Sequence, residues 1–122
     1  SNFYYYLSKS KMALNLSRGV YQKLYSSDRI SSLIGNGLLV FIDKKTEFNK
    51  LFTKNELIFF KNKYDLMNKI KYYSSNDKVR ARIAKMAYKK YHNHMNNQII
   101  SNYILNCVNL IKSKNPYWHN FI

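Results

Sequence analysis

Residues 26–43 read SSDRISSLIGNGLLVFID and predict a short helix, a glycine turn and a buried strand in succession. The serine and aspartate side chains at 26–28 can accept free backbone N–H groups, which favours a helix over residues 29–34. The Gly-Asn-Gly sequence at 35–37 ends that helix, because glycine and asparagine tolerate the left-handed conformation. The apolar run LLVFI at 38–42 is typical of a strand covered on both faces, as in a parallel sheet.

Short apolar runs on either side of this stretch predict the rest of the sheet. Residues 12–16 and 56–60 are the two further strand candidates. Residues 45–52 are expected to form a helix between the second and third strands, because their apolar side chains recur at helical spacing. Strands that alternate with helices imply right-handed crossovers and parallel pairing. The predicted fold is therefore α/β: a small parallel sheet with helices on both faces and a helical C-terminus.

Four more helices complete the expected organisation, the first over residues 3–10. Asn62 is expected to cap the helix that follows the third strand, and Asn76 or Asp77 to cap the next one. Cys107 falls on the apolar face of the last helix, so its thiol is expected to be buried and inert. The apolar positions expected on the last three helices are Leu66, Ile70 and Tyr73, then Val79, Ile83, Met86, Ala87 and Tyr91, then Ile99, Ile100, Tyr103, Ile104, Cys107, Val108 and Ile111.

The composition of the 122-residue chain is strongly basic and rich in aromatic residues. It carries 21 Lys and Arg against 6 Asp and Glu, a formal charge of +15, and 16% of its residues are aromatic. Aromatic residues at that frequency exclude an ordinary disordered basic tail. The charge favours an anionic partner such as nucleic acid, anionic lipid or a phosphorylated substrate. No apolar run approaches the roughly 18 residues of a membrane span, and a lone cysteine excludes a disulfide framework, so a cytoplasmic setting is expected.

The best candidate for a ligand site lies between residues 15 and 37. In open parallel sheets, ligands bind beyond the carboxyl ends of the strands and beside helix N-termini, which offer free N–H donors. Two of the four arginines fall here, and guanidinium groups bind phosphate oxygens through paired hydrogen bonds. These features predict a diphosphate site, with a purely structural helix cap and a solvated arginine as the alternative. The expected binding residues are Asn15, Arg18, Gly19, Ser27, Asp28 and Arg29.

The other polar residues do not predict a catalytic or metal site. His92 and His94, with His119, lack a carboxylate or cysteine nearby in sequence, so no metal site is expected. Asp43 and Glu47 are the one pair of carboxylates that could lie close together, and both are expected to be solvated. The sequence contains no Walker loop, nucleophile elbow or dinucleotide fingerprint.

A basic stretch at 78–91 interleaves cations with Tyr88 and Tyr91. Such a helix can bind nucleic acid, lie on anionic lipid, or present a solvated face. Those three interpretations stay open at this point. The cations nearest to the tyrosines are Arg80, Arg82, Lys85, Lys89 and Lys90.

Three stretches carry a resemblance to a known family. They read SSDRISSLIGNGLLVFID at 26–43, FNKLFTKNELIFFKNKYDLMNKIKYY at 48–73 and VRARIAKMAYKKYHNHMN at 79–96. In order and spacing they resemble the C-terminal, donor-binding half of glycosyltransferases with the GT-B fold. The branch that they resemble most closely is the group-one-like, CgeB-type branch.

The resemblance implies an enzyme that moves a sugar from a nucleotide-sugar donor to a saccharide or lipid-linked acceptor without a further cofactor. It implies a partial Rossmann-like domain over residues 1–112, an aromatic tail over 113–122, and a missing N-terminal domain that binds the acceptor. Arg29 would face the donor diphosphate. Ser32 stands where many relatives have a glutamate that binds the donor ribose or sugar, and Asn36 belongs to the small-residue turn before the strand.

The expected location is cytoplasmic, with contact to the anionic inner face of the membrane as an extension of the basic charge. Two other functions stay open beside the transferase. One is a small basic module that binds nucleic acid through the face at 85–91. The other is a structural domain that kept the fold and lost the donor site, which the serine at position 32 favours.

Overall fold

The computed structural model describes residues 2–16, 22–25, 27–109 and 116. Strands and helices alternate in its first half, as the sequence predicts, and helices follow. In chain order the elements are α1 (Phe3–Lys9), β1 (Met12–Asn15), α2 (Asp28–Gly35), β2 (Leu39–Asp43), the 3-10 turns η1 (Lys44–Thr46) and η2 (Phe48–Lys50), β3 (Ile58–Phe60), α3 (Lys63–Ser75), α4 (Asp77–His94) and α5 (Asn97–Val108).

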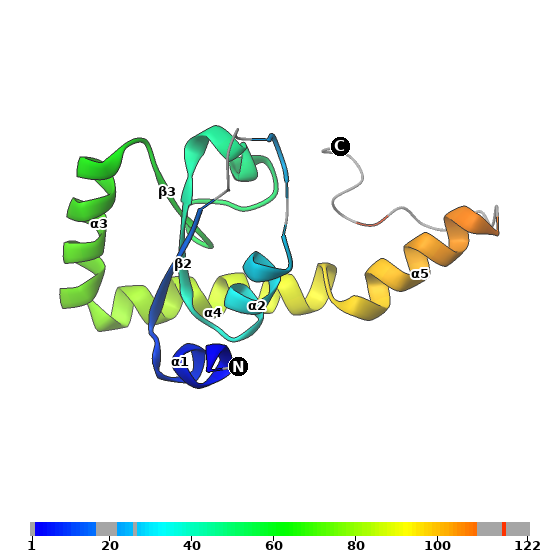
Figure 1. The fold of residues 1–122 in the computed structure, drawn as a ribbon, viewed down its shortest axis with the longest axis horizontal. Coiled ribbons are helices and arrows are strands. Elements are labelled where there is room, and N and C mark those ends of the chain that lie inside the picture. Colours follow the sequence, from blue (N-terminus) through cyan, green and yellow to red (C-terminus); the bar gives the residue numbers. More distant parts are fainter. Residues whose placement is uncertain (1, 17–21, 26, 110–115, 117–122) are drawn as a thin grey trace.

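The three strands form one parallel sheet in the order β1–β2–β3 (Figure 1). Ala13 of β1 lies opposite Val40 of β2, and Ile42 of β2 lies opposite Phe59 of β3. All five residues of β2 are buried, because it is the central strand and both of its faces are covered. Parallel pairing brings the carboxyl ends of the strands to one end of the sheet, named here the carboxyl edge; the other end is the amino edge.

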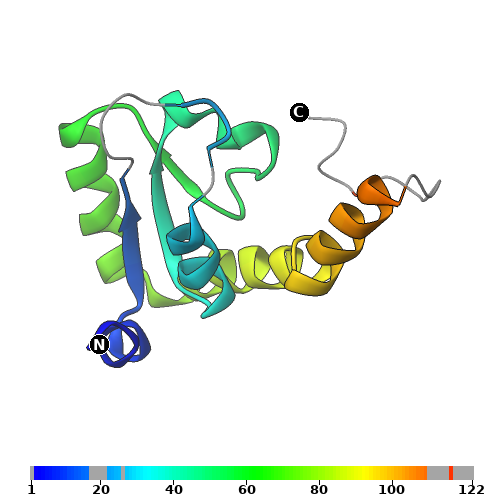
Figure 2. The same cartoon turned by 45° about the vertical axis from the view of Figure 1, so that its right-hand side comes forward.

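Helices cover both faces of the sheet, and each face has its own core (Figure 2). On one face, Val40 and Ile42 lie in a core with apolar residues of α2 and the 3-10 turns. On the other, Leu39 and Phe41 lie in a core with α3 and the first half of α4. Successive side chains of a strand point to opposite faces, so a strand covered on both sides must be apolar throughout. This confirms the predicted α/β class, with the parallel sheet of a partial Rossmann-like half.

α4 joins the two cores. Ile83 and Ala84 contribute to the core shared with α3, whereas Ala87 lies in the core shared with α2. The approach of α2 is close, since a Cβ atom built on Gly35 would lie 3.4 Å from the ring of Tyr91. In both views α4 runs along the amino edge of the sheet (Figures 1 and 2).

Most predicted elements are confirmed within two residues at each end. The strands expected at 12–16 and 38–42 are β1 and β2, and the third is shorter than predicted, starting at Ile58. Asn62 caps α3 as expected, because its Oδ1 accepts the backbone N–H of Asp65 at 3.0 Å. Asn76 occupies the cap position of α4 without a side-chain capping bond.

The helix predicted over residues 45–52 is wrong. Two short 3-10 turns stand in its place, separated by Glu47, whose φ of 56° lies in the left-handed region. A right-handed helix cannot pass through such a residue. The expected solvation of Asp43 is also wrong: its side chain is buried, and its Oδ1 accepts the backbone N–H of Lys45 at 2.8 Å.

Burial on the last two helices is lower than predicted. Met86 was expected on the apolar stripe of α4 but is exposed, since its neighbours Ile83 and Ala87 face the sheet and it does not. Cys107 is likewise exposed, because no residue of α5 is buried against the described part of the chain. Ile111 and the aromatic tail lie outside the described residues.

Candidate functional site

The end of β1 and the start of α2 meet at the carboxyl edge. Arg29, in the first turn of α2, donates a hydrogen bond from Nη1 to the carbonyl oxygen of Leu16 at 3.0 Å. Leu16 directly follows Asn15, the last residue of β1. The guanidinium group is therefore fixed at the edge where parallel sheets bind their ligands, and it keeps further N–H donors.

Asn15 is the one buried side chain with an unmatched polar atom among the described residues. The residue is 7% exposed, and its Oδ1 accepts no hydrogen bond from any described group. It shares a face of β1 with Ala13, whose side chain packs against the core under α2. A buried carbonyl oxygen without a donor costs free energy, so this atom indicates a position for an N–H or O–H group.

The N-terminus of α2 adds a partial positive charge and a carboxylate. Ser27 occupies the cap position in an extended conformation, and its side chain makes no capping bond. The N–H of Arg29 is bound by Oδ1 of Asp28 at 2.9 Å, and the N–H of Ile30 by the carbonyl of Ser27 at 3.2 Å. The helix dipole favours an anion here, while the carboxylate of Asp28 favours a donor such as a hydroxyl group.

The described part of the connection from β1 to α2 is held against η1. The N–H of Leu24 donates to the carbonyl oxygen of Thr46 at 2.8 Å. Nζ of Lys23 pairs with Oε1 of Glu47 at 2.8 Å, and Lys50 pairs with Oε2 of the same carboxylate at 2.7 Å. These two lysines lower the pKa of Glu47 to about 2. The carboxyl edge is thus bordered by a charged anchor that stays ionised near neutral pH.

A polar groove of about 700 Å³ runs along the outer side of α2. Asp28, Ser32 and Asn36 lie on one stripe of the helix at i, i+4 and i+8 spacing, and all three line the groove. Facing them are amide and imidazole side chains from the end of α4 and the start of α5: His92, Asn96, Asn97 and Gln98. Hydroxyl and amide groups both donate and accept hydrogen bonds, so a groove lined by several of them suits a neutral ligand with many hydroxyl groups.

Hydrogen bonds fix both walls of this groove. Nδ2 of Asn36 donates to the carbonyl oxygen of Ser32 at 2.7 Å, and Nε2 of His92 lies 3.3 Å from the carbonyl oxygen of Gly35. Oδ1 of Asn96 accepts the N–H of Ile99 at 3.0 Å and caps α5. Sequence reasoning missed His92 and Asn96 as groove residues, because no local pattern links them to α2.

The structure divides the predicted site residues into two groups. Asn15, Ser27, Asp28 and Arg29 converge at the carboxyl edge, as expected from the order of strand and helix. Ser32 lies one turn further along α2, and Asn36 just beyond its end towards the amino edge. Ser32 and Asn36 are connected to the first group by the polar groove, which Asp28 also lines. Arg18 and Gly19 lie outside the described residues.

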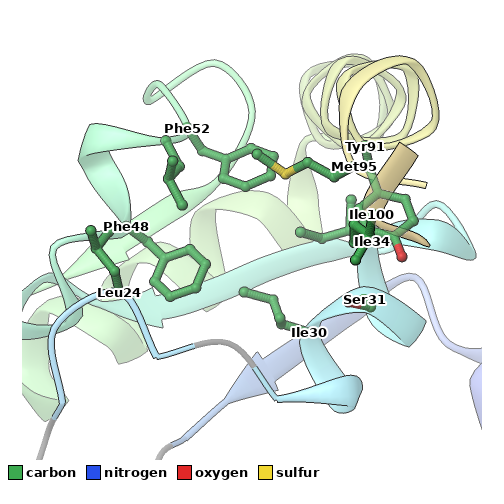
Figure 3. A pocket seen from close by; sticks show the side chains of 10 residues that line it. Leu24, Ile30, Ser31, Ile34, Phe48, Phe52, Tyr91, Met95 and Ile100 are labelled. Carbon is green, nitrogen blue, oxygen red and sulfur yellow. The ribbon is translucent and has the colours of Figure 1, made fainter. Parts of the chain in front are cut away.

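A second cavity of about 250 Å³ lies between α2, η2 and the end of α4 (Figure 3). Ile30, Phe48 and Phe52 form one side, while Tyr91 and Met95 close it from α4. Among its described lining residues, the polar side chains are Ser31 and Tyr91, and neither is a cation or an amide that could bind a diphosphate. None of the predicted site residues that the structure describes lines it.

The described residues were also searched for metal and membrane features. They contain no group of three or more His, Cys, Asp or Glu side chains that could hold a metal ion. Every helix among them is too short or too polar to traverse a lipid bilayer. His119 lies outside the described residues.

Comparison with known proteins identifies the family. A family model described as glycosyl transferase-like matches residues 1–106 of the 122. Neither a curated protein nor a solved structure gives a significant match. The matched region includes the whole sheet, α2 and the polar groove. The match extends over far more than half of the sequence, and the chain belongs to the glycosyl transferase-like family.

Proposed function

We propose that this chain binds the nucleotide-sugar donor of a glycosyltransferase at the carboxyl edge of its sheet. The donor diphosphate would lie at the N-terminus of α2, against the guanidinium of Arg29. The positive end of the helix dipole and a guanidinium suit phosphate oxygens through charge and hydrogen-bond geometry. The same groups would stabilise the negative charge that develops on the departing nucleoside diphosphate.

The observation that carries the proposal is the unmatched Oδ1 of Asn15, buried at the end of β1 beside the anchored Arg29. A phosphate oxygen cannot satisfy it, because both are acceptors. A hydroxyl group of the donor can satisfy it by donating a hydrogen bond. A nucleotide-sugar carries phosphate and hydroxyl groups close together, so one ligand would serve both residues.

The polar groove would hold the hydroxyl groups of the donor ribose or sugar. Asp28 and Ser32 follow one another along the stripe that starts at the diphosphate position. A glutamate in place of Ser32, which the resemblance to GT-B glycosyltransferases implies for many relatives, would make stronger, charge-assisted bonds to a ribose diol. The acceptor would be a saccharide, free or lipid-linked, and residues beyond this domain would complete its site.

A non-catalytic role is the second candidate, and Ser32 is the observation that favours it. A serine hydroxyl is shorter than a glutamate side chain and carries no charge, so it holds a diol less firmly. A domain that kept its sheet and lost its donor contacts would bind no nucleotide.

Titration calorimetry with UDP and GDP tests the proposal on the whole chain. We expect one of them to bind, and Arg29→Ala to weaken that binding at least about tenfold, the usual effect of removing a charged hydrogen bond. Arg82→Ala is the matched control, since Arg82 is an exposed arginine and belongs to α4, the helix that runs along the amino edge (Figure 1). Equal losses in both variants would contradict the proposed site, and binding of neither nucleotide would favour the non-catalytic role.

A further inference from the structure

A straight row of cations occupies the outer face of α4. Lys78, Arg82, Lys85 and Lys89 are all exposed and follow one another at i, i+4, i+7 and i+11. At 100° per residue they fall within one narrow stripe, directly opposite the buried side of the helix. Eleven residues of helix place the first and last of these cations roughly 16 Å apart along the axis.

No Asp or Glu side chain neutralises this cation row in the described part of the chain. All six acidic residues of the chain belong to its described part, and each is engaged elsewhere. Asp28 and Asp43 accept backbone N–H groups. The other four form the ion pairs Asp65–Lys69, Asp77–Lys11, Asp77–Arg80, Glu47–Lys23, Glu47–Lys50 and Glu56–Lys90. The cation row therefore presents its full charge to solvent and would attract an anionic partner.

Exposed apolar side chains flank the cation row. Met86 lies on one side of it and Tyr88 on the other, and both are exposed. Near the amino edge, α1 adds Phe3 and three consecutive exposed tyrosines at 4–6 (Figures 1 and 2). Tyrosine combines an apolar ring with a polar hydroxyl and is enriched where apolar and aqueous phases meet.

We propose that the outer face of α4 docks the protein on an anionic lipid surface. A straight row on a convex helix fits a flat array of lipid phosphates, while Met86 and Tyr88 would enter the boundary between headgroups and acyl chains. Duplex nucleic acid is favoured less, because its phosphates curve away from a straight rod. Docking at this end leaves the carboxyl edge facing away from the membrane, so the inference stands apart from donor binding.

Vesicle sedimentation of the whole chain tests this docking. The probes are vesicles of phosphatidylcholine alone and of equal parts phosphatidylcholine and phosphatidylglycerol, with a short DNA duplex as the third ligand. We expect binding to the anionic vesicles alone. Lys85→Gln combined with Lys89→Gln should weaken it about 25-fold, which is about fivefold for each charge.

The matched control is Lys44→Gln combined with Lys61→Gln. It removes the same charge from exposed lysines that follow β2 and β3 at the carboxyl edge. Anionic vesicle binding that survives in this control and falls in the α4 variant supports the proposal. Equal losses in both variants, no binding to anionic vesicles, or tighter binding to the duplex than to the vesicles would each overturn it. Circular dichroism verifies that each variant is folded.

Discussion

The guanidinium of Arg29 donates a hydrogen bond to the carbonyl oxygen of Leu16, and this 3.0 Å contact ties the first turn of α2 to the end of β1. The residues on either side of the contact are Asn15 and Asp28, which contribute a buried amide and a carboxylate to the same edge. One side chain therefore has two roles. It holds the edge together, and it presents its remaining donors to a ligand.

Replacing Arg29 with lysine should separate charge from geometry. Lysine keeps the positive charge but loses the planar fork that can hold Leu16 and a phosphate at once. We expect the affinity for the bound nucleotide to fall about tenfold, with a smaller change in the free energy of unfolding. Titration calorimetry and urea unfolding measure the two quantities. Unchanged nucleotide affinity in Arg29→Lys would show that charge alone suffices.

Replacing Ser32 with glutamate should strengthen nucleotide binding. The new carboxylate would reach along the groove to the ribose diol and accept two hydrogen bonds, a gain of about tenfold or more in affinity. The matched control is the 2′-deoxy form of the same nucleotide, which removes one of the two hydroxyl groups. If Ser32→Glu binds both forms with the same affinity, the groove does not hold the ribose.

Gly37 and Gly35 should respond differently to alanine. Gly37 has a φ of 75°, and the space beside it is open enough for a Cβ atom, 3.9 Å from the ring of Tyr88. Gly37→Ala should therefore cost about 1–2 kcal/mol of stability through backbone strain alone. Gly35 ends α2 without a positive φ, and a Cβ atom there would lie 3.4 Å from the ring of Tyr91, so Gly35→Ala should change stability by less than about 1 kcal/mol. Urea unfolding measures both, and equal losses would contradict the backbone argument.

Glu47 should make stability depend on pH in the acid range. Lys23 and Lys50 lower its pKa to about 2, against an ordinary value of 4.5. Because the pKa is lower in the folded state, the stabilisation is complete above pH 4.5 and is lost as the pH falls through about 2. The difference in the free energy of unfolding between the natural chain and Glu47→Gln should shrink over that interval.

Urea unfolding at a series of pH values measures this difference. Asp65 and Asp77 also have lowered pKa values, because Lys69 and Arg80 respectively bind them. Both groups are present in each protein, so their contributions cancel in the comparison. A difference that stays constant from neutral pH down to about 2 would show that the two lysines do not stabilise the Glu47 carboxylate.

The sheet could be predicted from the sequence because a strand buried on both faces needs a continuous run of apolar residues. The apolar run at 38–42 and its glycine boundary identify the central strand without any knowledge of its neighbours. The turn at 45–52 could not be found in this way. Its phenylalanines have helical spacing and are buried. The helix is nevertheless interrupted, because the backbone of Glu47 is left-handed. An ion pair with Lys23, which lies more than twenty residues earlier in the chain, holds the side chain of Glu47.

The candidate site was predictable only where chain order decides it. Asn15 ends a strand and Arg29 lies in the first turn of the next helix, so parallel pairing alone brings both to one edge. His92 and Asn96 reach the groove through the packing of α4 on α2, a contact across more than fifty residues that no local pattern indicates. Cys107 shows the reverse case, since an apolar stripe on α5 predicted burial and the helix lies exposed.

Because α4 contributes Ile83 and Ala84 to one core and Ala87 to the other, we expect that opening either core would disturb the packing of the other. Since α4 packs in both cores, the two cores should unfold together as one cooperative unit. In native-state hydrogen exchange, the amides of β2 and the middle of α4 should therefore exchange at a common slow rate, that of global opening.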